Sequence, residues 1–160
     1  MKSNILFICQ NRQKQKKIGK ALADELGMFY ADLNDIMKYN FIDEKTLQFS
    51  GKEYYEQQVY KAIKAASNYE NSLMIATFDS LNIKDAWSFI KKTCTVVYLK
   101  ESFEPYCGED CENKVNELVF EDRDIYLMEQ ADIIINNLNN EENCLQKIFE
   151  GMKSYFNIGQ

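Results

Sequence analysis

Basic side chains cluster near the start of this sequence, and anion binding is the chemistry that such a cluster favours. Arg12, Lys14, Lys16 and Lys17 follow a short apolar run and precede the first helical pattern. Lysine and arginine bind phosphate through charge-assisted hydrogen bonds, although a helix N-terminus disfavours positive charge by roughly 0.3–1 kcal/mol per residue. The cluster therefore has two interpretations: a site for a phosphate-bearing small molecule or an acidic protein surface, or a solvated basic loop.

The sequence contains few of the residues that other phosphate-binding or metal-binding motifs require. No glycine precedes Gly19, and Arg12 and Arg123 are the only arginines of the chain. A loop that wraps a phosphate with inward-facing amides needs glycine, since other residues disfavour positive φ. Cys107 and Cys111 have a spacing that zinc sites use, but the chain contains no histidine and no second close cysteine pair. We expect two thiols in a loop and no metal site.

Short apolar runs predict the strands that must position these side chains, at residues 4–9, 29–31, 73–77, 95–99 and 132–136. Helical patterns fill the intervals, with Ser50 and Glu53 forming a capping pair for one of them. The other helices are expected over 18–26, in short pieces over 33–48, around Trp87 and Ile90, after Ser102, over 121–130 and over 145–156, with a loop over 108–113. Alternating strands and helices predict a three-layer α/β/α fold with a five-stranded parallel sheet. Residues 1–160 are expected to form one domain.

Composition excludes some classes of function. The net charge of −6 argues against a general nucleic-acid binder, because phosphate contacts need a basic surface. No apolar run approaches the roughly 18 residues of a membrane span. Five cysteines without regular spacing are typical of reduced thiols inside a cell. We expect a cytoplasmic protein that contacts neither nucleic acid nor membrane.

Segments spread over nearly the whole chain form a recognisable set of motifs. They are Asn4-Ile-Leu-Phe-Ile, Ile18-Gly19-Lys20-Ala-Leu-Ala, Phe29-Tyr30-Ala31-Asp32, Gly51-Lys-Glu53-Tyr-Tyr55, Ala76-Thr77, Val96-Val-Tyr-Leu99 and Arg123 through Ala131-Asp132. In order and spacing they resemble the strands, helix and substrate segments of the shikimate kinase family. The resemblance implies a P-loop kinase-like fold, with Cys107 to Val119 at the position of the lid.

The positions that carry the family's phosphate chemistry hold other residues. Cys9, Arg12 and Lys14 stand where the glycines of its Walker A loop belong, Gln15 stands at the lysine, and Lys16 at the hydroxyl that holds magnesium. Losing one charge-stabilising arginine alone lowers phosphoryl transfer by about 10³–10⁵, and the lid segment of this chain contains no arginine. No catalytic residue is expected.

The substrate side of the resemblance is altered in the same way. Asp32 and Arg123 are retained, whereas Asn34 replaces a second aspartate, Glu56 replaces an arginine that grips the substrate carboxylate, and Asp79 lies within a former glycine run. These residues are expected to be remnants of a substrate pocket, with Asp32 as a cap or loop residue. If the scaffold is intact, Glu56 and Arg123 should pair directly and fill the pocket; the alternative is two unrelated exposed side chains.

Three functions follow from these departures. The leading hypothesis is a catalytically inactive pseudokinase with a binding or regulatory role, through a protein partner or a homo-oligomer, and with no cofactor. The second is a shikimate kinase with an atypical phosphate loop, which would use ATP and Mg. The third is an anion or nucleotide sensor that binds without turnover.

Overall fold

Five strands form one parallel sheet in the computed structural model of this protein, which describes residues 3–40, 44–105 and 110–157, without the side chains of residues 44, 46, 47, 110–112 and 157. The strands are β1 (Asn4–Ile8), β2 (Phe29–Asp32), β3 (Ser72–Ile75), β4 (Cys94–Glu101) and β5 (Ile133–Asn137). Their order across the sheet is β2-β3-β1-β4-β5. The central strand β1 pairs Ile5 with Leu73 on one side and with Thr95 on the other, so its carboxyl end lies between those of β3 and β4.

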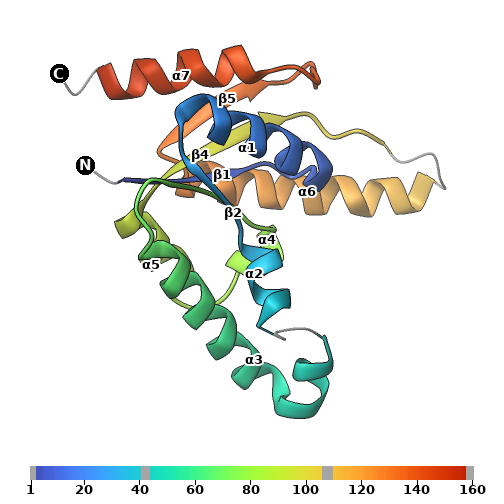
Figure 1. The fold of residues 1–160 in the computed structure, drawn as a ribbon. Helices are drawn as coiled ribbons and strands as arrows, with labels where there is room; N and C mark the ends of the chain where they lie inside the picture. Colours follow the sequence, from blue (N-terminus) through green and yellow to red (C-terminus); the bar gives the residue numbers. More distant parts are fainter. Residues whose placement is uncertain (1–2, 41–43, 106–109, 158–160) are drawn as a thin grey trace.

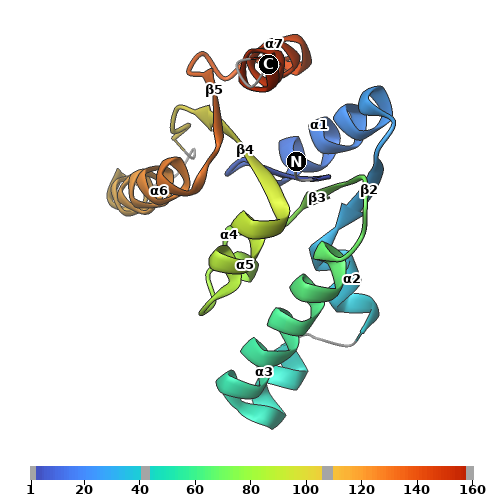
Figure 2. The same cartoon turned by 90° about the vertical axis from the view of Figure 1, so that its left-hand side faces the viewer.

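Helices cover both faces of the sheet (Figures 1 and 2). They are α1 (Arg12–Leu26), α2 (Leu33–Tyr39), α3 (Glu44–Ser67), α4 (Phe78–Leu81), α5 (Ala86–Thr93), α6 (Asp110–Gln130) and α7 (Leu145–Asn157). Residues of α1 and α7 pack with Phe7 and Val97 in one apolar cluster, and residues of α3, α5 and α6 pack with Leu6 and Val96 in the other. Successive residues of a strand point to opposite faces, so β1 and β4 contribute to both. The predicted three-layer α/β/α fold is confirmed.

Two predicted boundaries were wrong. Residues 102–105 form no helix, and α6 runs without a break from Asp110 to Gln130, including part of the expected loop. In α3 the helical geometry is interrupted at Gly51, with φ 82° and ψ 161°, one residue beyond the predicted cap Ser50. Glycine adopts this backbone conformation without the steric cost of a Cβ. The change of direction at Gly51 leads the long part of α3 back toward the sheet (Figure 1).

Among the described residues, no helix combines the length and the hydropathy that a bilayer crossing requires.

Candidate functional site

The turn between β1 and α1 has a different structure from the loop expected there. Helix α1 begins at Arg12, and Asn11 caps it, because its side-chain Oδ1 accepts a hydrogen bond from the Lys14 amide at 3.1 Å. The Gln15 amide donates to the Asn11 carbonyl at 2.9 Å. Asparagine is a favoured N-cap residue, and lysine and glutamine are good helix formers. Only Cys9, Gln10 and Asn11 therefore connect strand and helix, and residues 12–17, which were expected to lie in a loop, are helical.

Gln15 connects this helix to β1 and to the residue that follows β3. Its side chain is buried, and its Nε2 donates to the carbonyl oxygens of Phe7, at 3.2 Å, and Ala76, at 2.9 Å. Its Oε1 accepts from Arg12 Nη1 at 2.9 Å. All of the polar atoms of this amide thus have partners inside the protein, and the residue at the position of the family's lysine has a structural contact instead.

Arg12 is paired with a buried carboxylate. Its Nη2 donates to both side-chain oxygens of Asp32 at 2.8 Å, and the Asp32 side chain is only 3% exposed. Asp32 also caps α2 by accepting from the Asn34 amide at 3.0 Å. The expected cap role of Asp32 is therefore seen, and the Arg12 guanidinium is held against it.

Lys14 is buried in an ion pair on the other side of α1. Its Nζ contacts Glu101 Oε2, and the two side chains are 5% and 10% exposed. Glu101 Oε2 also accepts from Asn137 Nδ2 at 2.9 Å. Burial by itself lowers the pKa of Lys14, but the hydrogen bond and charge of Glu101, with Glu142 and Cys144, outweigh it and raise the pKa. Lys14 is thus a charged residue whose carboxylate partner is already in place.

Lys16 and Lys17 are exposed on α1. The four basic residues of the predicted anion cluster therefore divide into two groups, one engaged with carboxylates and one in solvent. The structure does not bring them together around a common point.

Two cavities flank the start of α1 at the carboxyl ends of the strands, where ligands bind in open α/β sheets. One, of about 190 Å³, is lined by both arginines of the chain together with Gln10, Gln15, Thr77 and Asp79. The other, of about 210 Å³, is lined by Lys14, Glu101, Glu104, Glu142, Phe103 and Phe120. The first cavity presents guanidinium groups, whereas the second is mainly acidic.

Arg123 reaches the first cavity from α6, but its partner is not the predicted one. Its Nη2 donates to Asp79 Oδ1 at 3.1 Å, and its guanidinium lies 4.8 Å from the centre of the Phe78 ring. Asp79 is on α4, which follows β3 after two residues. Asp79 thus supplies the carboxylate that we had expected from Glu56.

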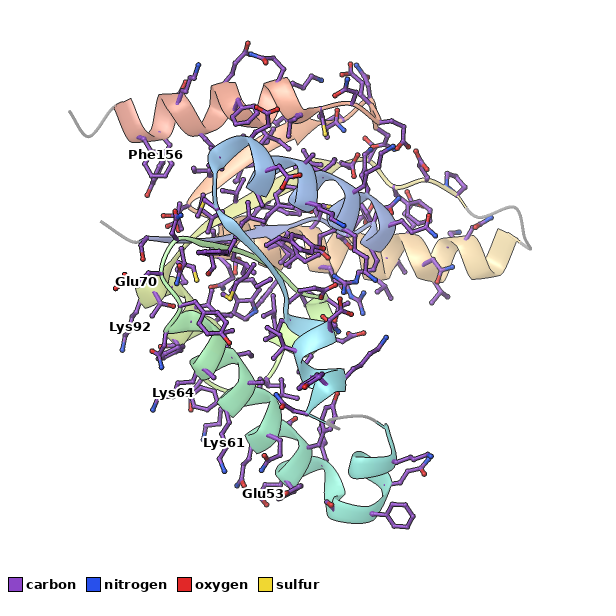
Figure 3. All side chains as sticks on the ribbon, in the orientation of Figure 1. Glu53, Lys61, Lys64, Glu70, Lys92 and Phe156 are labelled. Carbon is purple, nitrogen blue, oxygen red and sulfur yellow. The ribbon has the colours of Figure 1, made fainter. Side chains whose placement is uncertain are left out.

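The predicted pairing of Glu56 with Arg123 is therefore wrong. The nearest recorded charge to Glu56 is Lys52, whose Nζ lies 4.0 Å from Glu56 Oε1 one helical turn away. Glu56 lines a different cavity, of about 490 Å³, with Glu53, Lys61 and Lys64. Figure 3 shows those three side chains along one side of α3.

Asn34, another predicted pocket remnant, joins two helices. Its Oδ1 accepts from the Thr77 amide at 3.1 Å, and its Nδ2 donates to Ser80 Oγ at 3.0 Å and to Thr77 Oγ1 at 3.2 Å. These bonds hold α2 against the start of α4, so the side-chain amide of Asn34 is fully engaged.

The structure describes only part of the predicted lid, Cys107 to Val119. Cys107 lies outside the described residues, and the Cys111 side chain is among those left out. Residues 108 and 109 also lie outside the described residues, and residues 110–119 form the first half of α6. Within the described part of the chain, no group of three or more histidine, cysteine or acidic residues is placed to hold a metal ion.

Sequence reasoning missed Gln10 and Glu101. Gln10 Nε2 donates to the Phe120 carbonyl at 3.0 Å, which connects the β1–α1 turn to α6. Glu101 ends β4. The signal for both was their position within two residues of the carboxyl end of a predicted strand, 4–9 or 95–99, because that edge of a parallel sheet forms sites.

Cys9, beside this turn, provides a test of the site's electrostatics. Burial, reinforced by the charge of Glu101, raises the pKa of its thiol, whereas a thiol in an unfolded chain titrates near pH 8.5. Above that pH the unfolded state releases a proton that the folded state keeps, so this contribution to stability falls as the pH rises. We expect the free energy of unfolding of the wild type to fall by about 1.4 kcal/mol per pH unit more than that of Cys9→Ala between about pH 9 and 10.5.

Urea denaturation at a series of pH values, with reductant present, measures this difference. Parallel profiles for the two proteins would show that the thiol ionises as easily in the folded state as in the unfolded chain.

Solved structures define the class of fold. The chain aligns with a shikimate kinase from Bacteroides thetaiotaomicron at 16% identity and a TM-score of 0.74, over 99% of this chain and 98% of that one. It aligns equally with the shikimate kinase of Aquifex aeolicus, at 20% identity, with a TM-score of 0.74 over 98% and 99% of the two chains. A dephospho-CoA kinase from Campylobacter jejuni aligns over the full length of both chains at 14% identity with a TM-score of 0.61. The fold is that of the P-loop kinases.

The family follows from the sequence match. The family model described as shikimate kinase matches residues 16–153, and this chain belongs to the shikimate kinase family. The match begins at Lys16 and so leaves out Cys9 to Gln15, where the phosphate loop would lie. No curated protein sequence matches the chain closely enough to count as a relative.

Proposed function

We propose that this protein is a catalytically inactive member of the shikimate kinase family, with a binding or regulatory role. The observation that carries the proposal is the start of α1 at Arg12, which puts a capped helical turn at the position of the phosphate loop. Phosphoryl transfer depends on a glycine-rich cradle, a lysine on the β- and γ-phosphates and a hydroxyl on Mg²⁺. The residues present do not fit that requirement, because Lys14 and Gln15 are engaged inside the protein and Lys16 stands at the hydroxyl position.

The charge of the neighbouring cavity supports the same conclusion. Glu101, Glu104 and Glu142 line it, and only one of these acids, Glu101, has a lysine partner in the described structure. A triphosphate brought beside them would meet like charges, which cost free energy at short range. A nucleotide is therefore an unfavourable occupant of this side of α1.

A coupled assay of ADP release tests the proposal. With ATP, Mg²⁺ and shikimate, we expect no shikimate-dependent ADP above about one thousandth of the rate of the Bacteroides thetaiotaomicron enzyme at equal concentration, because each lost phosphate contact lowers the rate by orders of magnitude. Shikimate-dependent ADP release above that level would restore the kinase hypothesis.

Anion sensing without turnover is a second candidate function, favoured by the 190 Å³ cavity that both arginines line. Arg123 is 37% exposed and its partner Asp79 is 81% exposed, so this pair is solvated and weak and an incoming carboxylate or phosphate can replace Asp79. Titration calorimetry of the same preparation with shikimate, phosphate and sulfate provides the test. Binding lost in Arg123→Ala and kept in Lys17→Ala would favour the sensor, and an absence of heat from all three anions would leave the protein-binding role.

A further inference from the structure

Helix α6 exposes apolar side chains on the side away from the sheet. The α6 stripe consists of Val115, Leu118, Val119, Ile125 and Met128, of which Val115 and Leu118 are each 60% exposed and Ile125 is 58% exposed. Leu127, which is buried, fixes the side of α6 that packs on the core. At 3.6 residues per turn, Leu118 and Ile125 lie roughly opposite Leu127, whereas Val119 and Met128 lie at the sides of the helix. The middle of the stripe therefore faces away from the core.

The arrangement of the helix leaves the stripe accessible. In Figure 1 the N-terminal part of α6 extends past the end of the sheet, and in Figure 2 α6 lies at the edge of the molecule. None of the described helices or strands covers its outer side in either view. Large solvent-exposed apolar patches with polar rims mark interaction sites.

Three of the five stripe residues have the spacing of a helix-packing seam. Val115, Leu118 and Ile125 follow the three- and four-residue intervals of heptad a and d positions, and Asp122 occupies the a position between Leu118 and Ile125. Seams of this kind pack against another helix. An acidic residue in the middle of the seam requires a cationic residue opposite, since burying it unpaired is costly.

The charge of α6 indicates the charge that a partner should carry. Its sequence contains seven acidic and two basic residues, a net charge of −5. The rest of the chain contains 18 acidic and 17 basic residues, so nearly the whole net charge of −6 lies on this helix. Within the part of the chain that the structure describes, Glu117, Glu121, Asp122 and Glu129 have no recorded cationic partner. These acids flank or interrupt the stripe and are exposed.

We propose that the α6 stripe docks an amphipathic, basic helix of another protein, whose apolar side chains cover Leu118 and Ile125 and whose lysines or arginines face the surrounding acids. A second copy of this chain is a poor occupant, because two α6 helices would place their negative charges against each other. Charge complementarity instead favours a partner of opposite sign, steers its approach and weakens with salt.

Binding of a synthetic helical peptide to the full chain tests the inference. The probe is a fluorescent peptide of about 18 residues, five turns, with leucine at the a and d positions and lysine at the flanking ones; a second peptide carries glutamate in place of each lysine. By fluorescence anisotropy we expect the lysine peptide to bind at least about tenfold more tightly than the glutamate peptide. Its affinity should fall as the salt concentration is raised.

Three variants locate the site. Leu118→Glu with Ile125→Glu should weaken binding of the lysine peptide at least about tenfold. Phe49 is an exposed apolar residue on α3, and Phe49→Glu should leave the affinity for that peptide unchanged. Asp122→Lys with Glu129→Lys should reverse the preference toward the glutamate peptide. Circular dichroism melting checks that each variant is folded. Because the substituted side chains are exposed, we expect all three variants to fold.

Several outcomes would overturn the proposal. They are no binding of the lysine peptide at low salt, equal binding of both peptides, or equal weakening by Phe49→Glu. Dimerisation of the wild type that Leu118→Glu with Ile125→Glu abolishes, seen by analytical ultracentrifugation, would assign the stripe to a second copy of the chain instead.

Discussion

Replacing Lys14 with alanine should lower the free energy of unfolding by about 3–5 kcal/mol, because it leaves the Glu101 carboxylate inside the protein without its cation. Both side chains of this pair are nearly excluded from solvent, at 5% and 10% exposure. The remaining hydrogen bond from Asn137 Nδ2 cannot neutralise the charge. Urea denaturation at neutral pH measures the loss, and a lysine whose role was to bind phosphate in solution would show almost none.

Lys16→Ala is the matched control, since Lys16 is two residues away on the same helix and exposed; its effect should stay within about 0.5 kcal/mol. A double variant, Lys14→Met with Glu101→Leu, removes both charges and should recover most of the stability, as replacing a buried ion pair with apolar residues is often neutral. If Lys14→Ala is no less stable than Lys16→Ala, then the pair is solvated and Lys14 is free to act as an anion ligand.

Local signals in the sequence were sufficient for the sheet and most helices. Buried strands such as β1 and β3 are short apolar runs, and the helices between them show the spacing of an apolar face. The start of α1 was misplaced although Asn11, followed by helix-forming lysines and glutamines, was an adequate capping signal. Alignment with the glycine loop of the family predicts a loop over these residues, but their helix propensity and the Asn11 cap produce a helix.

The contacts of the site could not be predicted in this way, because they join residues that are distant in sequence. Lys14 and Glu101 are 87 residues apart, and Asp79 and Arg123 are 44 apart. The first pair joins the start of α1, which follows β1, to the carboxyl end of the neighbouring strand β4, and the second joins α4 to α6; both depend on elements that meet only once the sheet has formed. Glu56 was expected to reach Arg123 because of its position in the motif, but Asp79 on the adjacent α4 occupies the place beside the guanidinium.

Gln15→Lys, which restores the lysine of the family's phosphate loop, should destabilise this protein by about 3 kcal/mol and create no nucleotide binding. The Gln15 amide accepts a hydrogen bond from Arg12 and donates to the carbonyls of Phe7 and Ala76. A lysine can donate but cannot accept, so Arg12 loses a partner. The new ammonium would also be buried next to the Arg12 guanidinium, whose two bonds to Asp32 already use that carboxylate.

Gln13→Lys is the control for this substitution, because it makes the same chemical change at an exposed position of the same helix. Its stability should match the wild type within about 0.5 kcal/mol, and thermal unfolding with and without ATP and Mg²⁺ should give no shift for either variant. A stable Gln15→Lys protein whose unfolding temperature rises with ATP would mean that the helical turn at Arg12 opens into a phosphate loop when a lysine is supplied. The absence of a phosphate loop would then depend on the Gln15 side chain alone. We expect instead that Asn11, Arg12 and Gln15 together hold the first turn of α1 closed, so that replacing Gln15 does not open it.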